Sequence, residues 1–247
     1  LALDPGYLTF TTHDKVNKPE HHNVVLVDGQ GPADYLAASF AWGSNPAGRP
    51  PAEGQSTLFD WVSSDAGDAV SVATAYQGAR LQRRVVFGGD RYLVVADEVD
   101  APASSDLTWM LHGNGGGSSG GSYERTVAGG RWTVGGARLD SAIAVAGATP
   151  TLTEAQAVHE VPYTQERTHT ALAASAPAAA GTTAALQVLY PTRSGQAAPA
   201  VTRTVVAGHP AVVVVDAAAR RRVTAVQRAT GAGDLWADGV RADASLL

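Results

Sequence analysis

Short runs of apolar and β-branched residues alternate with clusters of glycine, proline, serine and aspartate along most of the chain. Within residues 70–76 the side chains alternate with a period of two, which places Val70, Val72 and Thr74 on one face of a strand. Strand-like runs cover residues 24–27, 70–76, 84–87, 92–95, 107–111, 131–134, 185–189, 201–206, 211–215 and 222–226. This spacing is typical of an antiparallel all-β protein. We therefore predict a single domain over residues 1–247, a large β-sandwich of two stacked antiparallel sheets.

Three segments depart from this pattern. Residues 171–185 are rich in alanine, but Pro177, Gly181 and paired threonines favour a loop or a connection between strands over a helix. Residues 42–51 have no periodic apolar face and are predicted to form a surface loop. Residues 113–122 are nearly all glycine, serine and asparagine, so we predict a flexible loop that begins directly after His112.

Composition excludes several classes of function. A chain of 247 residues without cysteine has no disulfide, no thiolate metal site and no cysteine nucleophile. Its formal net charge of -5 and its lack of basic runs argue against nucleic acid as a partner. The longest apolar runs, such as residues 211–215, are far below the ~20 residues that cross a membrane. The first eight residues lack an initiating methionine and a basic leader, which is typical of a processed product or of the later part of a longer chain.

The pair His21-His22, followed by Asn23, stands at the start of an apolar run that ends in an Asp28-Gly29 turn. A histidine with an ordinary pKa of about 6.5 can serve as an acid, a base or a metal ligand near neutral pH. Since adjacent residues of a strand face opposite sides, His21 and His22 are expected to have different roles. The alternative is a pair of histidines that are solvated or hydrogen-bonded to the backbone.

A divalent metal in a chain without cysteine has to be held by histidine and carboxylate, and two histidines with one aspartate suit zinc. His112 ends one strand-like run, and His21 or His22 begins another. These residues would converge with an acid if their strands pair. The candidate acids are Asp60, Asp65 and Asp68.

Two further side chains have both a chemical and a structural interpretation. Arg84, next to Arg83, offers a forked guanidinium for a substrate carboxylate, or else the pair forms cross-strand ion pairs with Asp97 or Glu98. Tyr76 ends its run and could transfer a proton near a sugar oxygen, or else it packs its ring and bonds its hydroxyl internally. A serine hydrolase is excluded, because no Gly-x-Ser-x-Gly motif stands between a strand and a helix.

The order of motifs resembles the C-terminal β-sandwich of the heparinase II/III-like polysaccharide lyases, a family that includes oligoalginate lyases. The matching motifs are Asp4-Pro5-Gly6, His22-Asn23-Val24-Val25-Leu26-Val27-Asp28-Gly29-Gln30, Ala73-Thr74-Ala75-Tyr76, Arg83-Arg84-Val85-Val86-Phe87, Tyr92-Leu93-Val94-Val95-Ala96-Asp97-Glu98-Val99 and His112. They span about residues 4–115. The family resemblance implies an α/α toroid beside the sandwich and cleavage of uronic-acid glycans by β-elimination in the cleft between them. The toroid is lacking here, so we expect a separate chain or domain to supply it.

The resemblance also assigns roles to individual residues. It implies that a histidine of the His21-His22-Asn23 motif faces the cleft, and we take His21 as catalytic. Tyr76 is the second predicted catalytic residue, and Asn23 and Arg84 are predicted to bind substrate. The resemblance implies a structural zinc ion held by His22, Asp68 and His112. Glu20 occupies the position of a further histidine of the family, so it stays open which of His21 and His22 is catalytic and which binds metal. Asp60 and Asp65 remain alternatives to Asp68.

The implied partner is an acidic polysaccharide or oligosaccharide, and the implied location is secreted or periplasmic. The competing interpretation is a non-catalytic β-sandwich that binds carbohydrate or scaffolds a partner. Such a module should gather exposed aromatic residues on one sheet face. Aromatic residues make up only 6% of this chain and are scattered along it, which favours the lyase.

Overall fold

The computed structural model describes the chain outside residues 1, 7, 10, 32–55, 65–66, 90, 163, 230–233 and 243–245, and of residues 56–74 and 242 it describes the backbone alone. The regular secondary structure of the described residues consists of strands and two short 3-10 helices. The helices are η1 (His13–Lys15) and η2 (Pro19–His21). The strands are β1 (Val25–Val27), β2 (Ser56–Ser64), β3 (Gly67–Tyr76), β4 (Ala79–Gly88), β5 (Tyr92–Ala101), β6 (Ser105–His112), β7 (Ser122–Arg125), β8 (Gly130–Val134), β9 (Ala137–Val145), β10 (Thr151–Glu160), β11 (Glu166–Ala178), β12 (Gly181–Arg193), β13 (Ala200–Val206), β14 (His209–Asp216), β15 (Arg221–Val226), β16 (Leu235–Ala237) and β17 (Val240–Ala242).

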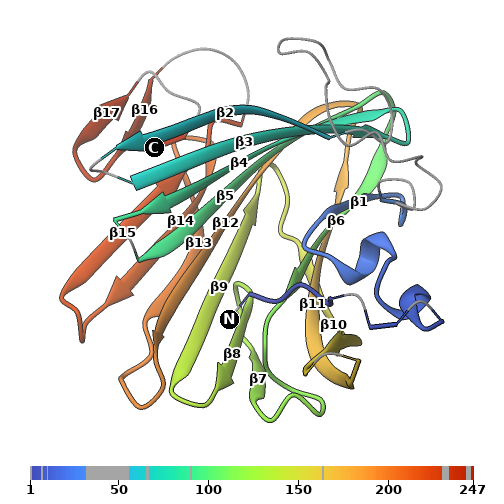
Figure 1. Ribbon diagram of the computed structural model, residues 1–247. Helices are drawn as coiled ribbons and strands as arrows, with labels where there is room; N and C mark the ends of the chain where they lie inside the picture. Colours follow the sequence, from blue (N-terminus) through green and yellow to red (C-terminus); the bar gives the residue numbers. More distant parts are fainter. Residues whose placement is uncertain are drawn as a thin grey trace.

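The strands form three layers. The central layer is an eight-stranded sheet with the order β2-β3-β4-β5-β12-β9-β8-β7. A four-stranded sheet, β1-β6-β11-β10, covers one of its faces, and a three-stranded sheet, β13-β14-β15, lies on the other side (Figure 1). The hairpin β16-β17 is a separate two-stranded sheet that packs against the third layer. All strand pairs are antiparallel, so the predicted all-β antiparallel fold is confirmed.

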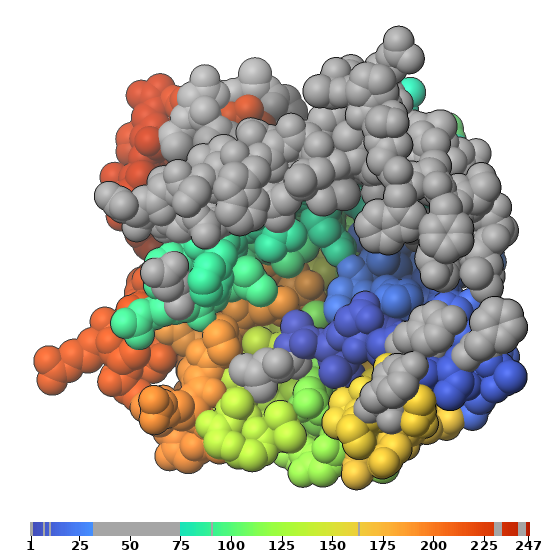
Figure 2. Space-filling model, viewed as in Figure 1, coloured from blue at the N-terminus to red at the C-terminus, as the bar shows by residue number. Residues whose placement is uncertain are grey.

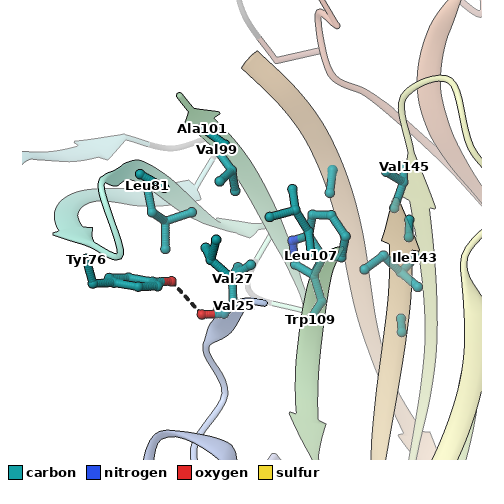
Figure 3. Close-up of a cluster of buried hydrophobic side chains, with 14 residues drawn as sticks. Val25, Val27, Tyr76, Leu81, Val99, Ala101, Leu107, Trp109, Ile143 and Val145 are labelled. Carbon is teal, nitrogen blue, oxygen red and sulfur yellow. Dashed lines mark hydrogen bonds between the residues drawn. The ribbon is translucent and has the colours of Figure 1, made fainter. Parts of the chain in front are cut away.

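The main core lies between the four-stranded and eight-stranded sheets (Figure 3). Val25 and Val27 of β1 and Trp109 of β6 face Leu81 of β4 and Ile143 of β9 across this interface, and each is at most 8% exposed. Burial of apolar area stabilises the fold by about 25 cal/mol per Å². Strand β1 contributes three consecutive buried residues, so the polar segment before it is attached directly to the core.

A second core joins the central sheet to the three-stranded sheet. Val188 of β12 and Ala142 of β9 pack with Val212 and Val214 of β14, and all four are at most 1% exposed. The period of two in β14 turns Val215 outward, where it is 41% exposed. The sandwich predicted from two sheets therefore carries a third, smaller layer.

Nine of the ten predicted strand-like runs lie within observed strands, and the run predicted at residues 24–27 begins one residue before β1. The Asp28-Gly29 turn is also confirmed, since both residues have positive φ and Val27 and Gln30 exchange backbone hydrogen bonds. The alanine-rich segment does not form a long loop. It contains the end of β11 and the start of β12, joined by a turn at residues 179–180. Alanine prefers helix, but small side chains fit where two sheets lie close, and Ala174 and Ala184 are at most 1% exposed.

The glycine-serine loop is hydrogen-bonded to β11. Ser118 and Thr168 exchange two bonds, from the Ser118 N–H to Thr168 Oγ1 (2.9 Å) and from the Thr168 N–H to Ser118 Oγ (2.8 Å). The Thr170 N–H donates to the Gly115 carbonyl at 2.9 Å. These bonds attach both halves of the loop predicted at residues 113–122. The loop predicted at residues 42–51 lies outside the described residues.

Candidate functional site

The polar segment between η2 and β1 forms the candidate site. Helix η2 begins with Pro19, whose fixed φ suits a first helical position. Its last residue, His21, accepts the Lys18 N–H on Nδ1 at 3.2 Å, so a neutral His21 ring carries its proton on Nε2. Burial is the main cause that lowers the pKa of His21, and the ring is therefore neutral at pH 7. In this form His21 is a hydrogen-bond donor.

His22 and Asn23 connect this segment to the N-terminal residues and to β6. His22 Nδ1 lies 3.0 Å from Asp4 Oδ2. The Asn23 side chain donates to the Leu3 carbonyl at 2.9 Å and accepts the His112 N–H at 2.7 Å. Both ends of the Asn23 amide are thus engaged with backbone, and the residue holds three chain segments in register.

The predicted site residue Tyr76, together with Arg83, supports the backbone of this segment. Tyr76 is 3% exposed, and its hydroxyl donates to the Val25 carbonyl at 2.5 Å (Figure 3). Burial raises the pKa of Tyr76, so the hydroxyl keeps its proton. Arg83 donates to the Asn23 carbonyl and makes two bonds to Asp97, at 2.7 and 2.8 Å. Tyr76 therefore packs its ring in the core and holds strand β1, which is the structural interpretation given above, and its catalytic role stays a prediction.

Arg84 forms a cross-strand ion pair with Glu98, which was the structural alternative to substrate binding. Its guanidinium donates to Glu98 at 2.7 Å and to the Gln82 side chain at 3.0 Å. The cross-strand pairing of Arg83 with Asp97 and of Arg84 with Glu98 is confirmed. A substrate carboxylate would have to displace Glu98 to reach both arms of the Arg84 fork.

A row of three buried histidines lies behind the segment. His112 Nε2 is 3.0 Å from the Glu20 carbonyl, and His112 Nδ1 is 2.8 Å from His169 Nε2. His169 Nδ1 is in turn 3.1 Å from His159 Nδ1. Each of the three rings is at most 1% exposed. The histidines come from β6, β11 and β10, neighbouring strands of one sheet.

The row fixes the tautomer of every ring. A carbonyl can only accept, so His112 carries its proton on Nε2 and accepts on Nδ1. His169 must then donate from Nε2 and accept on Nδ1, and His159 must donate from Nδ1. Burial lowers the pKa of His112 to about 4 and that of His169 to about 3, and it also lowers the pKa of His159. All three rings are neutral at pH 7, with one proton for each hydrogen bond.

The predicted zinc ligands are brought together only in part. His22 lies close enough to His112 to affect its pKa. Both ring nitrogens of His112, however, are engaged in hydrogen bonds. The side chain of Asp68 lies outside the described residues, as do those of Asp60 and Asp65. Among the side chains that the structure describes, no three histidines or acids are grouped as a metal requires, so these do not by themselves form a zinc site.

The N-terminal segment lies at the surface against the hairpin of β10 and β11. In Figure 2 it lies in blue beside the yellow hairpin of β10 and β11. The Glu160 N–H donates to the Pro5 carbonyl at 2.8 Å, and Lys15 Nζ lies 2.6 Å from Glu166 Oε2. These contacts place the Asp4-Pro5-Gly6 motif against the sheet that carries the histidine row.

No protein-family model matches the chain, and no curated protein matches it. Solved structures do match. The crystal structure of the heparan sulfate lyase HepC from Pedobacter heparinus has a TM-score of 0.65 and 16% identity over 91% of this chain. A crystal structure of heparinase III has a TM-score of 0.67 and 13% identity over 90% of it. In fold, the chain is similar to part of a heparan sulfate lyase. It spans about a third of those proteins, 34% of HepC and 32% of heparinase III.

Within this lyase-like fold, the residues that the sequence did not single out are His159 and His169. Neither adjoins a recognisable motif, and the strands that carry them, β10 and β11, were not predicted. The pairing of β11 with β6 sets Ala171 opposite His112, which brings His169 to the same face. Knowledge of that register was needed to find the row.

Proposed function

We propose that this chain is the β-sandwich portion of a polysaccharide lyase. It would act on a uronic-acid-containing glycan by β-elimination and be completed by an α/α toroid, on another chain or domain. The supporting observation is the likeness to HepC and heparinase III, which covers nearly all of this chain and leaves two thirds of those proteins for other structure. A secreted or periplasmic location follows from the same proposal. Among the described residues, no helix is long and apolar enough to cross a membrane.

The site supports a contributing role in that reaction. β-Elimination requires neutralisation of the uronate carboxylate, removal of the C5 proton and protonation of the leaving oxygen. A neutral His21 with its proton on Nε2 suits hydrogen-bond donation to the glycan better than proton removal. Asn23, Arg83 and Tyr76 position His21 and His22 by holding the backbone around them. The base would come from the toroid.

The proposal is tested by assaying the formation of unsaturated uronate from its ultraviolet absorbance. The glycans to be assayed are heparan sulfate, heparin, chondroitin, hyaluronan and alginate. We expect the 247-residue chain alone to cleave none of them, and the protein with its toroid to cleave at least one. His21→Gln in the complete protein should lower kcat about 100-fold and change KM little, because a donor that acts on developing charge contributes mainly in the transition state.

His209→Gln is the matched control for that variant, because His209 lies on β14 in the third layer. It should leave kcat unchanged. Rapid product formation by the isolated chain would overturn the proposal that the active site is shared between this chain and a toroid. A complete protein that binds acidic glycans but releases no unsaturated product would favour the alternative, a carbohydrate-binding module.

A zinc ion held by His22, Asp68 and His112 remains a separate prediction. To bind it, His112 would have to release the Glu20 carbonyl or His169, since each ring nitrogen already has a partner. If the ion binds, a chelator should lower Tm and zinc should restore it, an effect of roughly 4 kcal/mol at a thousandfold excess over Kd. The effect should fade below about pH 6 as imidazoles take up protons. Less than ~0.1 zinc per chain, with a Tm that ignores chelator, would remove the metal.

A further inference from the structure

We propose that a groove on the third-layer side of the molecule is a second binding site, which takes an anionic group, carboxylate or sulfate ester, carried by a saccharide. The groove has a volume of about 400 Å³. Its lining comes from the end of β12, the loop after it, the β14–β15 connection and the β4–β5 turn. None of these residues belongs to the segment around His21.

Three arginines from separate parts of the chain converge on the groove. Arg91 lies in the β4–β5 turn, Arg193 ends β12 and Arg221 begins β15. Among the described residues of the lining, Asp216 is the one acid. The lining therefore carries an excess of positive charge on a chain whose formal net charge is -5. Such a contrast attracts anions to this position on an otherwise acidic protein.

Asp216 forms no ion pair with these arginines among the residues that the structure describes. It is 6% exposed, and both of its oxygens are engaged, one by the Tyr190 hydroxyl at 3.2 Å and the other by the Ala219 N–H at 3.0 Å. Arg91 and Arg193 form no ion pair with any residue in the part of the chain that the structure describes. Their guanidinium groups are therefore available to a ligand.

The wall of the groove is rigidly built. Arg138, 7% exposed, donates to the carbonyls of Gln196 and Ala197 at 2.9 and 3.0 Å and to the Thr192 hydroxyl at 2.9 Å. The loop beside Arg193 is thereby fixed from behind by a buried cation. On the opposite wall the Arg221 side chain lies near the Tyr190 hydroxyl, opposing the rise in its pKa that burial and Asp216 cause.

The chemistry of the lining selects the class of ligand. Guanidinium groups bind planar carboxylates and sulfate oxygens through paired hydrogen bonds. The Thr192 hydroxyl and the Gln196 amide also line the groove and suit the hydroxyls of a sugar ring. The volume lies within the range of small-ligand sites. Only the choice of a saccharide as carrier rests on the proposed function, because the geometry for binding an anion does not depend on it.

The test is calorimetric binding by the full 247-residue chain at low salt. The probes are a heparin tetrasaccharide, a hyaluronan tetrasaccharide and the neutral cellotetraose. We expect the charged probes to bind and cellotetraose not to bind. Arg91→Gln/Arg193→Gln should weaken binding at least tenfold and reduce its dependence on salt, because two charged contacts are removed. Arg193→Lys keeps the charge but loses the fork, and should bind at least threefold more weakly than the wild type.

The control is Arg125→Gln/Arg241→Gln, which removes the same charge from arginines that pair with Glu154 and Asp234 elsewhere. It should leave affinity unchanged. Binding of both tetrasaccharides identifies carboxylate as the group, and binding of heparin alone identifies sulfate. Equal weakening in the control pair, equal binding of cellotetraose, or no binding of either charged probe would overturn the site. The lyase assay is read separately, so failure here and failure of the proposed function are distinguishable.

Discussion

Acidification from pH 7 to pH 4.5 should destabilise the chain by about 2–3 kcal/mol through His112 alone, and further through His169. The folded-state pKa of His112 is about 4 and that of His169 about 3, both below the ordinary value of 6.5. Between 6.5 and these values the unfolded chain binds more protons than the folded one. The contribution of these histidines to the free energy of unfolding is therefore fully present above pH 6.5 and decreases as the pH falls. It levels off only below the folded-state pKa values.

The measurement is the free energy of unfolding in urea at a series of pH values between 7 and 4.5. His169→Gln should be less stable than the wild type at pH 7, because it breaks a buried row of hydrogen bonds, and its stability should fall less steeply with acid. His209→Gln, which removes a histidine outside the row, should keep the wild-type slope. If the free energy of unfolding of His169→Gln fell with pH as steeply as that of the wild type, the buried histidines would not be the cause of the acid sensitivity.

Nitrogen-15 NMR of the imidazoles tests the same row without any substitution. At pH 7 we expect the proton on Nε2 of His112 and His169 and on Nδ1 of His159, as the direction of hydrogen bonding from the Glu20 carbonyl requires. A different tautomer in any of the three rings would mean that the row is not continuous. This readout remains valid even if His169→Gln fails to fold.

Local patterns made ten of the seventeen described strands predictable, but the arrangement of the strands in layers was not predictable. Apolar alternation and the Asp28-Gly29 turn identified ten strands from sequence alone. Strands β10 and β11 escaped notice because alanine, threonine and charged residues dominate them. Their character comes from packing between sheets, which no short window contains. The third layer, β13–β15, was found as strands but could not be assigned to a separate sheet.

The candidate site shows a similar division. The segment from His21 to Asn23 was identified from its residue types, and it does lie at the start of a strand, beside His112. Roles were harder to assign, because Asn23, Arg83 and Tyr76 bind backbone atoms of distant segments. A sequence displays side chains and their order, and it does not display which carbonyl lies within reach. The residues named for chemistry therefore include several that support the backbone of the site.

Removing the Asp97 carboxylate should have the largest effect of any single substitution near the site, a loss of roughly 3–5 kcal/mol in Asp97→Ala. The Asp97 side chain is 3% exposed, and the change leaves the Arg83 charge without its partner while Arg83 still faces the Asn23 carbonyl. Glu154→Ala breaks the exposed pair with Arg125 and should cost less than about 1 kcal/mol. The measurement is urea unfolding at pH 7.

A double variant separates the lost pair from the stranded charge. Arg83→Met/Asp97→Val replaces both ions by apolar side chains, so it should be more stable than Asp97→Ala, because no uncompensated charge remains. Hydrogen exchange gives the local readout: the amides of His112 and Met110, which donate to Asn23 and Val24, should exchange faster in Asp97→Ala than global unfolding explains. If Asp97→Ala stays within 1 kcal/mol of the wild type and these amides stay protected, the ion pair does not hold the start of β1, and Tyr76 and Asn23 suffice to position His21 and His22.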